Sequence, residues 1–174
     1  MSTVRRPIVA FDIGLVNFTF IIVDVENKRI TNILEWVNTS LSQTKSRPTW
    51  ATIYSRINDV LDAYSEILET CDTCLIEKQM SRLNKLATRI SHHVFSYYSI
   101  IWPNINVLEY LAYHKTENST CRLKTKLERK KYCIQQTIED LATAKDDVNL
   151  GFFLAQRKQD DLADVYQMIR AYAC

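Results

Sequence analysis

The order of strand-like and helix-like segments constrains the fold more than any other feature of this sequence. Residues 7–12, 18–25 and 30–37 are rich in apolar, β-branched and aromatic side chains, so they predict three strands in an antiparallel meander. After a polar, loop-like stretch at residues 38–48, longer amphipathic segments alternate with short apolar ones. Strands that are joined through helices usually run parallel, by right-handed crossovers. We therefore predict an α/β fold in which a mixed sheet of five strands is flanked by helices.

The later elements follow from the same periodicity. Apolar residues that recur at helical spacing predict four helices, and two short apolar runs between them predict the fourth and fifth strands. The predicted helices cover residues 49–70, 81–102, 127–144 and 158–173, and the predicted strands cover residues 73–77 and 105–111. The stretch at residues 146–155 is poorly patterned, and the stretch after the fifth strand is a basic, hydroxyl-rich loop.

Length and composition indicate one globular domain over residues 1–174. A chain of 174 residues is long enough for a real hydrophobic core, and its 2 glycines and 3 prolines exclude long flexible linkers. No apolar run approaches the roughly 20 residues that a membrane-spanning helix needs. We therefore expect no membrane association and an intracellular location.

The five cysteines fit a reducing environment because they are scattered and odd in number. Cys71 and Cys74 form a CxxC pair, but a zinc site would need a second pair of ligands. Cys121 and Cys133 lack the usual close spacing for that role. We expect buried thiols, and the sequence leaves open whether Cys71 and Cys74 have any role.

Carboxylates stand at the ends of two predicted strands. Asp12 ends the first strand and Glu77 ends the fourth, so both acids emerge at one edge of the sheet if these strands are parallel neighbours. Asp161 and Asp164 are three residues apart and therefore share one face of the last helix. Converging carboxylates cannot all ionise cheaply without cations, and oxygen ligands favour magnesium or manganese over zinc. The pattern predicts a metal site.

Each acid also has an ordinary structural interpretation. Asp12 would serve as a turn or cap residue, and Glu77 would pair with Lys78 or Arg82 at the surface. The "DDLAD" segment would be the solvated face of a helix. The joint pattern, with acids at these ends and in this order, favours the metal site.

Two basic stretches suit a polyanion. Four Lys or Arg and no acid occur between Lys78 and His93, and seven occur between His114 and Lys131 against two acids. Solvated helix faces are the alternative interpretation. The residues predicted to bind nucleic acid are Lys78, Arg82, Lys115, Arg122, Lys124, Lys126, Lys130 and Lys131.

Three motifs occur in a familiar order: "AFDIGLVN", "LIEKQ" and "RKQDDLADVYQMIRAY". Together with the basic segment "ERKKYCIQQTIEDL", they resemble the RuvC-type Holliday junction resolvases of the ribonuclease-H-like fold. The resemblance covers nearly the whole chain. It is strongest to the short resolvases of poxviruses and related large DNA viruses, and the fungal mitochondrial resolvases are more distant.

This resemblance implies a magnesium-dependent endonuclease that cuts four-way DNA junctions or other branched DNA by paired hydrolysis. By position in the motifs, Asp12, Glu77, Asp161 and Asp164 would hold two Mg²⁺ ions, for which Mn²⁺ may substitute. Lys158 would contact the scissile phosphate or orient the attacking water. Asp160 remains an alternative to Asp161, because residues 160 and 164 are also one helical turn apart.

The resemblance further implies a homodimer, with a contact through the helix at residues 81–102, and no organic cofactor. If the chain is viral, the host cytoplasm is the expected location, and a mitochondrial or nuclear location stays open. Two other functions remain: another ribonuclease-H-like activity, on RNA–DNA hybrids or general branched DNA, and non-catalytic DNA binding. The four acids disfavour a pure binder, because negative charge repels phosphates.

Overall fold

A mixed sheet of five strands, in the order β3-β2-β1-β4-β5, forms the centre of the molecule. The computed structural model describes the chain except for residues 1–6, 43–47, 81–83, 118, 120–122 and 174. The strands are β1 (Pro7–Asp12), β2 (Phe18–Glu26), β3 (Arg29–Thr39), β4 (Thr73–Glu77) and β5 (Asn106–Tyr110). The first three strands are antiparallel, and β4 and β5 continue the sheet parallel to β1. The predicted α/β fold is confirmed.

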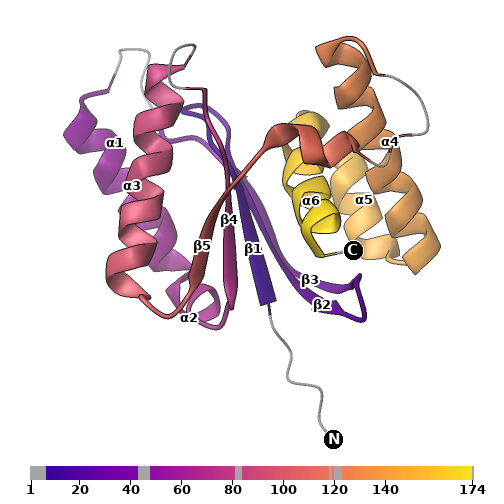
Figure 1. The fold of residues 1–174 in the computed structure, drawn as a ribbon, viewed down its shortest axis with the longest axis horizontal. Coiled ribbons are helices and arrows are strands. Elements are labelled where there is room, and N and C mark those ends of the chain that lie inside the picture. The colour runs from indigo at the N-terminus through magenta and orange to yellow at the C-terminus, as the bar shows by residue number, and fades with distance from the viewer. Residues whose placement is uncertain (1–6, 43–47, 81–83, 118, 120–122, 174) are drawn as a thin grey trace, which may run out of the picture.

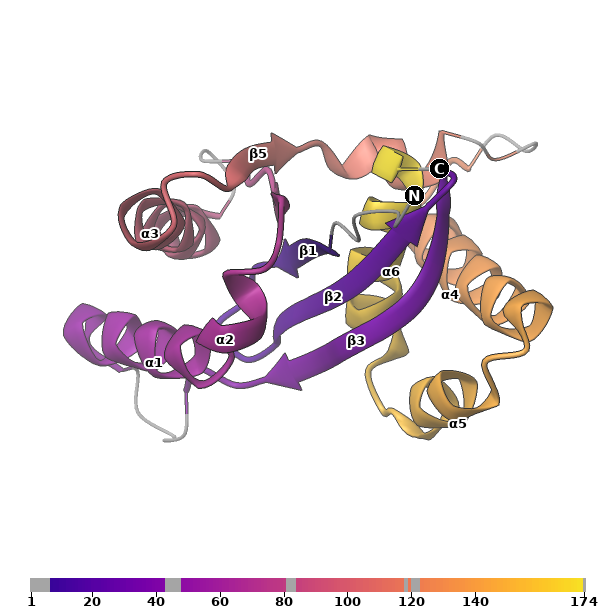
Figure 2. The ribbon, with the colours of Figure 1, turned by 90° about the horizontal axis from the view of Figure 1, so that it is seen from below.

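Helices cover both faces of this sheet, as Figure 1 shows. The helices are α1 (Trp50–Ala63), α2 (Ser65–Leu68), α3 (Lys85–Ile101), the 3₁₀ helix η1 (Ala112–Thr116), α4 (Lys126–Ala144), α5 (Asp147–Ala155) and α6 (Gln159–Ala173). Helices α1, α2 and α3 lie on one face, and α4, α5 and α6 lie on the other (Figures 1 and 2). No helix in the described part of the chain is long and apolar enough to cross a membrane.

Strand alternation divides the hydrophobic core between the two faces. Side chains of one strand point alternately to opposite faces. Phe11 of β1 and Ile76 of β4 therefore pack with α1 and α3, whereas their neighbours Ala10 and Leu75 pack with α4 and α6. The strands in the middle of the sheet are buried on both faces, which explains why they read as continuous apolar runs.

The helix predicted at residues 49–70 is two helices in the structure. Tyr64 adopts φ −113° and ψ 12°, which ends α1, and α2 adds one further turn. The Tyr64 ring packs edge-on against Phe20 of β2, with ring centroids 5.1 Å apart. This contact fixes the junction between α1 and α2 on the sheet. Leu68 of α2 is also buried.

Two segments without a clear pattern are helical. The stretch at residues 146–155 contains α5. Asp146 caps this helix, because its side chain accepts a hydrogen bond from the backbone N–H of Asn149 at 3.1 Å. Its apolar residues point both inward and outward: Phe153 is buried, whereas Val148 is 82% exposed. An apolar helix without a polar face gives no amphipathic signal. The predicted loop after β5 contains η1, which bears on the site described below.

The first prediction concerns how α5 is anchored. Phe153 stacks on Trp36 of β3, with ring centroids 5.3 Å apart and planes 13° from parallel. Phe153→Ala leaves a cavity there, so we expect the free energy of unfolding to fall by about 3–5 kcal/mol in urea denaturation. The matched control is Val148→Ala on the exposed side of the same helix, which should change it by less than about 0.5 kcal/mol. Equal effects of the two substitutions would contradict the anchoring role.

Candidate active site

The pairing of β1 with β4 places two acids side by side. These strands are parallel neighbours, as predicted, and Phe11 pairs with Ile76, so the next residues are Asp12 and Glu77. By strand alternation, both carboxylates follow Ala10 and Leu75 to the face that α6 covers. The edge of the sheet therefore carries two neighbouring acids that point toward the last helix.

Helix α6 brings further acids to the same place. Its apolar side packs on the sheet through buried residues that include Leu162, Val165 and Ile169. This packing leaves Asp161 and Asp164, one helical turn apart, with partly buried carboxylates. Asp164 reaches the site through a shared cation: the Lys115 ammonium lies 3.1 Å from its Oδ2.

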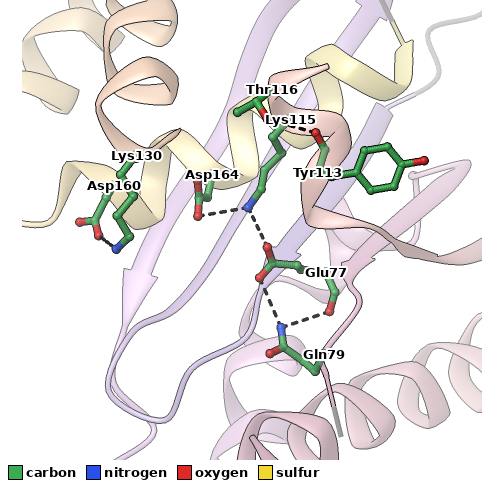
Figure 3. A network of polar contacts seen from close by, with 8 residues as sticks. All are labelled: Glu77, Gln79, Tyr113, Lys115, Thr116, Lys130, Asp160 and Asp164. Carbon is green, nitrogen blue, oxygen red and sulfur yellow. Dashed lines mark hydrogen bonds and ion pairs between the residues drawn. The ribbon is translucent and has the colours of Figure 1, made fainter. Parts of the chain in front are cut away.

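Lys115, on η1, is the centre of this group (Figure 3). Its Nζ lies 2.7 Å from Glu77 Oε1 as well as 3.1 Å from Asp164 Oδ2, and its side chain is only 6% exposed. The basic sequence around Lys115 predicts a residue on a nucleic-acid-binding surface, whereas the structure buries its side chain among the acids. Its position directly after the fifth strand was the available signal, because β5 ends beside Glu77.

The charges of Asp12 and Glu77 are unequal. Burial, and then the nearby negative charge of Glu77, raise the pKa of Asp12 well above its usual value. Burial alone would also raise the pKa of Glu77, but the Lys115 ammonium holds it below the usual value. Of the two carboxyl groups, Asp12 therefore binds a proton more readily than Glu77.

At both Asp164 and Lys115, burial and the charge of the partner shift the pKa in opposite directions. Burial raises the pKa of Asp164 despite the Lys115 charge. Burial would lower the pKa of Lys115, but the charges of Asp164 and Glu77 raise it. One buried cation thus faces more negative charge than it can neutralise.

Two neighbouring aspartates of α6 have different partners. Asp160 forms an ion pair with Lys130 of α4, and this contact holds the pKa of Asp160 down although burial opposes it. Asp161 has a buried Oδ2 atom without a hydrogen-bond partner among the described residues, and burial raises its pKa. The charge of Asp160 is therefore paired with Lys130, whereas Asp161 keeps an oxygen that could bind a further cation.

Gln79 is a site residue that sequence reasoning missed. Its side-chain amide donates to Glu77 Oε2 at 3.3 Å and to the Glu77 backbone carbonyl at 3.2 Å (Figure 3). These contacts orient the Glu77 carboxylate opposite Lys115. Only the proximity of Gln79 in sequence could have indicated this role.

The remaining predicted cations occupy various positions. Lys158 is exposed just before α6, and its charge contributes to the lowered pKa of Asp160 and opposes the rise in the pKa of Asp161. Lys78 is exposed and lies 3.8 Å from Glu109. Exposed positions around the start of α4 hold Lys124, Lys126 and Lys131. Arg82 and Arg122 lie outside the described residues.

The donor set fits a divalent metal, although in the structure the Lys115 ammonium lies among these acids. In the described ranges, no three His, Cys, Asp or Glu side chains are grouped closely enough to hold a metal ion. The reason is visible at Lys115, whose ammonium lies between Glu77 and Asp164. The buried, unpartnered oxygen of Asp161 and the surplus of carboxylates nevertheless match the oxygen ligands of magnesium or manganese.

The acids lie apart from a cavity of about 700 Å³ between the end of β3 and α1. That cavity is lined by hydroxyl-bearing residues together with Arg56 and Asp59, and none of the candidate acids contributes to it. Asp12 and Glu77 instead lie at the ends of β1 and β4.

Comparison of the sequence with known proteins gives a viral relative. No protein-family model matches the sequence. An uncharacterized protein, 97L, of invertebrate iridescent virus 3 is 36% identical over 118 residues, which cover 67% of this chain. The match spans 55% of that protein, so the chain corresponds to about half the length of this relative.

Similar solved structures are Holliday junction resolvases. The fowlpox virus resolvase in complex with Holliday junction DNA has a TM-score of 0.65 at 18% identity, and the match covers 96% of both chains. The yeast mitochondrial Holliday junction resolvase Ydc2 has a TM-score of 0.63 at 12% identity, covering 95% of this chain and 78% of its own. Thermus thermophilus RuvC has a TM-score of 0.61 at 16% identity, covering 96% and 95%. The predicted resemblance is confirmed at the level of the fold.

The second prediction concerns the cost of the Asp12 charge. Because the pKa of Asp12 is raised in the folded protein, ionisation of this group disfavours folding once the pH exceeds the unfolded pKa of about 4. Asp12→Asn removes the charge and can still donate a hydrogen bond to Glu77. In EDTA, we expect the variant to be more stable than wild type by about 1–3 kcal/mol at pH 8 and nearly equal to it below about pH 4.

Urea denaturation across this pH range measures the difference. The control is Asp59→Asn at an exposed position of α1, whose difference from wild type should stay small throughout. A stability difference for Asp12→Asn that is the same at pH 4 and pH 8 would contradict the assigned cause.

Proposed function

We propose that this protein is a Holliday junction resolvase, a metal-dependent endonuclease that cuts four-way DNA junctions by paired, symmetric hydrolysis of phosphodiesters. The observation that carries the proposal is the meeting of Asp12, Glu77 and Asp164 around one buried cation at an edge of the sheet. The likeness in fold to resolvases of fowlpox virus, yeast mitochondria and Thermus thermophilus supports the same conclusion. The described residues form one sheet covered on both faces, which supports a single nuclease domain over residues 1–174.

In this proposal, Asp12, Glu77, Asp161 and Asp164 hold two Mg²⁺ ions, for which Mn²⁺ may substitute. Two ions bound in this way supply an activated water and stabilise the leaving oxygen of the phosphodiester. The chain itself fixes the ligands on rigid elements: two strand ends and one helix. Gln79 orients Glu77, and the ion pair of Asp160 with Lys130 ties α6 to α4.

The cations around the acids would bind the DNA backbone. Lys158, exposed at the start of α6, is placed to contact the scissile phosphate. The exposed residues Lys124, Lys126 and Lys131 would contact phosphates farther along the DNA. Arg82, Arg122 and Lys78 are further candidates for such contacts. Phosphate contacts of this kind position DNA without reading its sequence.

Resolution of a four-way junction requires two cuts, and a homodimer supplies two sites. Helix α3 has exposed apolar residues that its own sheet does not cover, namely Phe95, Ile100 and Ile101. An exposed apolar surface of this kind suits contact with a second copy. The viral relative supports action inside an infected host cell.

Two other functions would use the same fold. Cleavage of RNA–DNA hybrids or of general branched DNA would need the same acids, so substrate preference separates it from resolution. A DNA-binding protein without catalysis would gain nothing from buried carboxylates, which cost stability and repel phosphates.

The third prediction tests the function directly. In Mg²⁺, the protein should cut a synthetic four-way junction much faster than a duplex or an RNA–DNA hybrid of the same sequence. A supercoiled plasmid that extrudes a cruciform should become linear, because paired cuts open both strands, whereas single cuts leave a nicked circle. Asp12→Asn should bind the junction and reduce cleavage by about 10³-fold, because a ligand to the metal contributes several kcal/mol.

The outcomes of this assay separate the alternatives. Preference for the hybrid, or nicked circles only, would replace resolution with a more general nuclease. Binding without cleavage by wild type at any Mg²⁺ or Mn²⁺ concentration would favour the non-catalytic binder.

The fourth prediction separates the two adjacent aspartates. Asp161→Asn should reduce the single-turnover rate on a junction by at least about 100-fold, because it removes a ligand. Asp160→Asn should reduce it by less than about tenfold, because that residue contacts Lys130 and acts only through the position of α6. Junction affinity, measured in EDTA, should be similar for both variants. The reverse order of the two rates would show that Asp160 is the ligand.

A further inference from the structure

Lys115 has the environment of a bound cation and not that of a surface lysine. Its ammonium contacts both Glu77 at the end of β4 and Asp164 on α6. These two acids are 87 residues apart in the sequence. The side chain is 6% exposed, so solvent supplies little of its solvation. Figure 3 shows the ammonium between the two carboxylates.

The contact distances suit an ammonium and not a metal. The Nζ–oxygen distances of 2.7 and 3.1 Å are those of charge-assisted hydrogen bonds. Magnesium binds oxygen at roughly 2.0–2.1 Å in an octahedral shell, so the carboxylates must move closer to it than to an ammonium. An ammonium and a metal ion therefore cannot occupy the space between Glu77 and Asp164 together.

A single positive charge also leaves this cluster undercompensated. Asp12 lies next to Glu77, and the charges of both acids act on Lys115 together with that of Asp164. One ammonium thus faces three carboxyl groups. A divalent ion would neutralise the cluster more fully.

We propose that Lys115 is the internal counterion of the metal-free site, and that its ammonium must leave Glu77 and Asp164 before a divalent ion can bind them. This inference rests on the proposed metal site and adds how that site is loaded. Metal binding becomes an exchange of one cation for another, so the metal affinity of the free protein is lower than the four carboxylates alone would provide. A DNA phosphate offers the displaced ammonium a new partner, so DNA and metal favour each other's binding.

The side chain of lysine suits such an exchange. Its ammonium is a compact charge on a flexible four-carbon stem, so it can leave the carboxylates without movement of the backbone. The 3₁₀ helix that carries Lys115 is held by local bonds outside the cluster, including His114 to Glu117 at 2.8 Å and Thr116 to the Tyr113 carbonyl at 3.2 Å. The helix can therefore stay in place while the ammonium moves.

The fifth prediction is a measurement of metal binding in the absence of DNA. Lys115→Met keeps most of the stem and removes the charge. We expect Mn²⁺, followed by the paramagnetic resonance of the free ion, to bind this variant at least about tenfold more tightly than wild type. In EDTA the variant should melt at a lower temperature than wild type, because its carboxylates lose their cation. Saturating Mn²⁺ should raise its melting temperature by more than that of wild type.

Two substitutions serve as controls. Lys115→Arg keeps a positive charge at the site, so its Mn²⁺ affinity should stay close to that of wild type. Lys85→Met removes an exposed lysine at the start of α3 and should change neither Mn²⁺ affinity nor melting temperature.

A measurement on wild type avoids dependence on how well the variants fold. In lysine-selective ¹H–¹⁵N spectra, the buried ammonium of Lys115 should give a signal that Lys115→Arg lacks. Titration with Mg²⁺ should shift or abolish this signal at the concentrations that saturate the metal site. A signal that is unchanged at saturating Mg²⁺ would overturn the exchange, and so would equal Mn²⁺ affinities of wild type and Lys115→Met. Absence of metal binding to wild type and all variants would instead remove the metal site itself, and the proposed function with it.

Discussion

The parallel pairing of β1 with β4 determines where the candidate site forms. The pair Phe11–Ile76 ends the register, and the next residue on each strand is an acid. Alternation then turns both carboxylates to the α6 face, while their apolar neighbours fill the core on either side. A shift of one residue in either strand would send one acid to the opposite face. The continuous apolar core that fixes this register therefore also fixes the geometry of the site.

Burying these acids lowers the stability of the folded protein, and nearby lysines offset part of this loss. Burial raises the pKa values of Asp12, Asp161 and Asp164, so each carboxylate is less favourable in its charged form than it would be in water. Lys115 neutralises part of the charge from within, and Lys130 neutralises Asp160 from α4. A surplus of negative charge remains. Such a surplus is stable only in a fold whose core holds the acids in place, and it favours the binding of a further cation.

Much of the fold could be predicted, because local periodicity reports strands and amphipathic helices well. The adjacency of Asp12 and Glu77 could be predicted only on the condition that β1 and β4 are parallel neighbours, which the pairing in the structure fulfils. Three features depended on contacts that the sequence does not display. Tyr64 breaks a periodic helix through its contact with Phe20, and α5 has no polar face to mark it as a helix. Lys115 looked like one more surface cation because its burial depends on where η1 meets α6.

The sequence also could not distinguish the roles of Asp160 and Asp161, because these too depend on contacts with another element. Helical spacing places either of them on a face with Asp164, so periodicity alone cannot separate them. In the structure the two residues differ through α4, a different element, whose Lys130 pairs with Asp160, whereas Asp161 has an oxygen without a partner among the described residues. The same helix begins with exposed lysines on the α6 side of the sheet (Figure 1). Helix α4 thus pairs with one acid through Lys130 and presents other lysines to solvent. The proposed approach of DNA phosphates to the carboxylates depends on this arrangement, because the exposed positive charge offsets the repulsion.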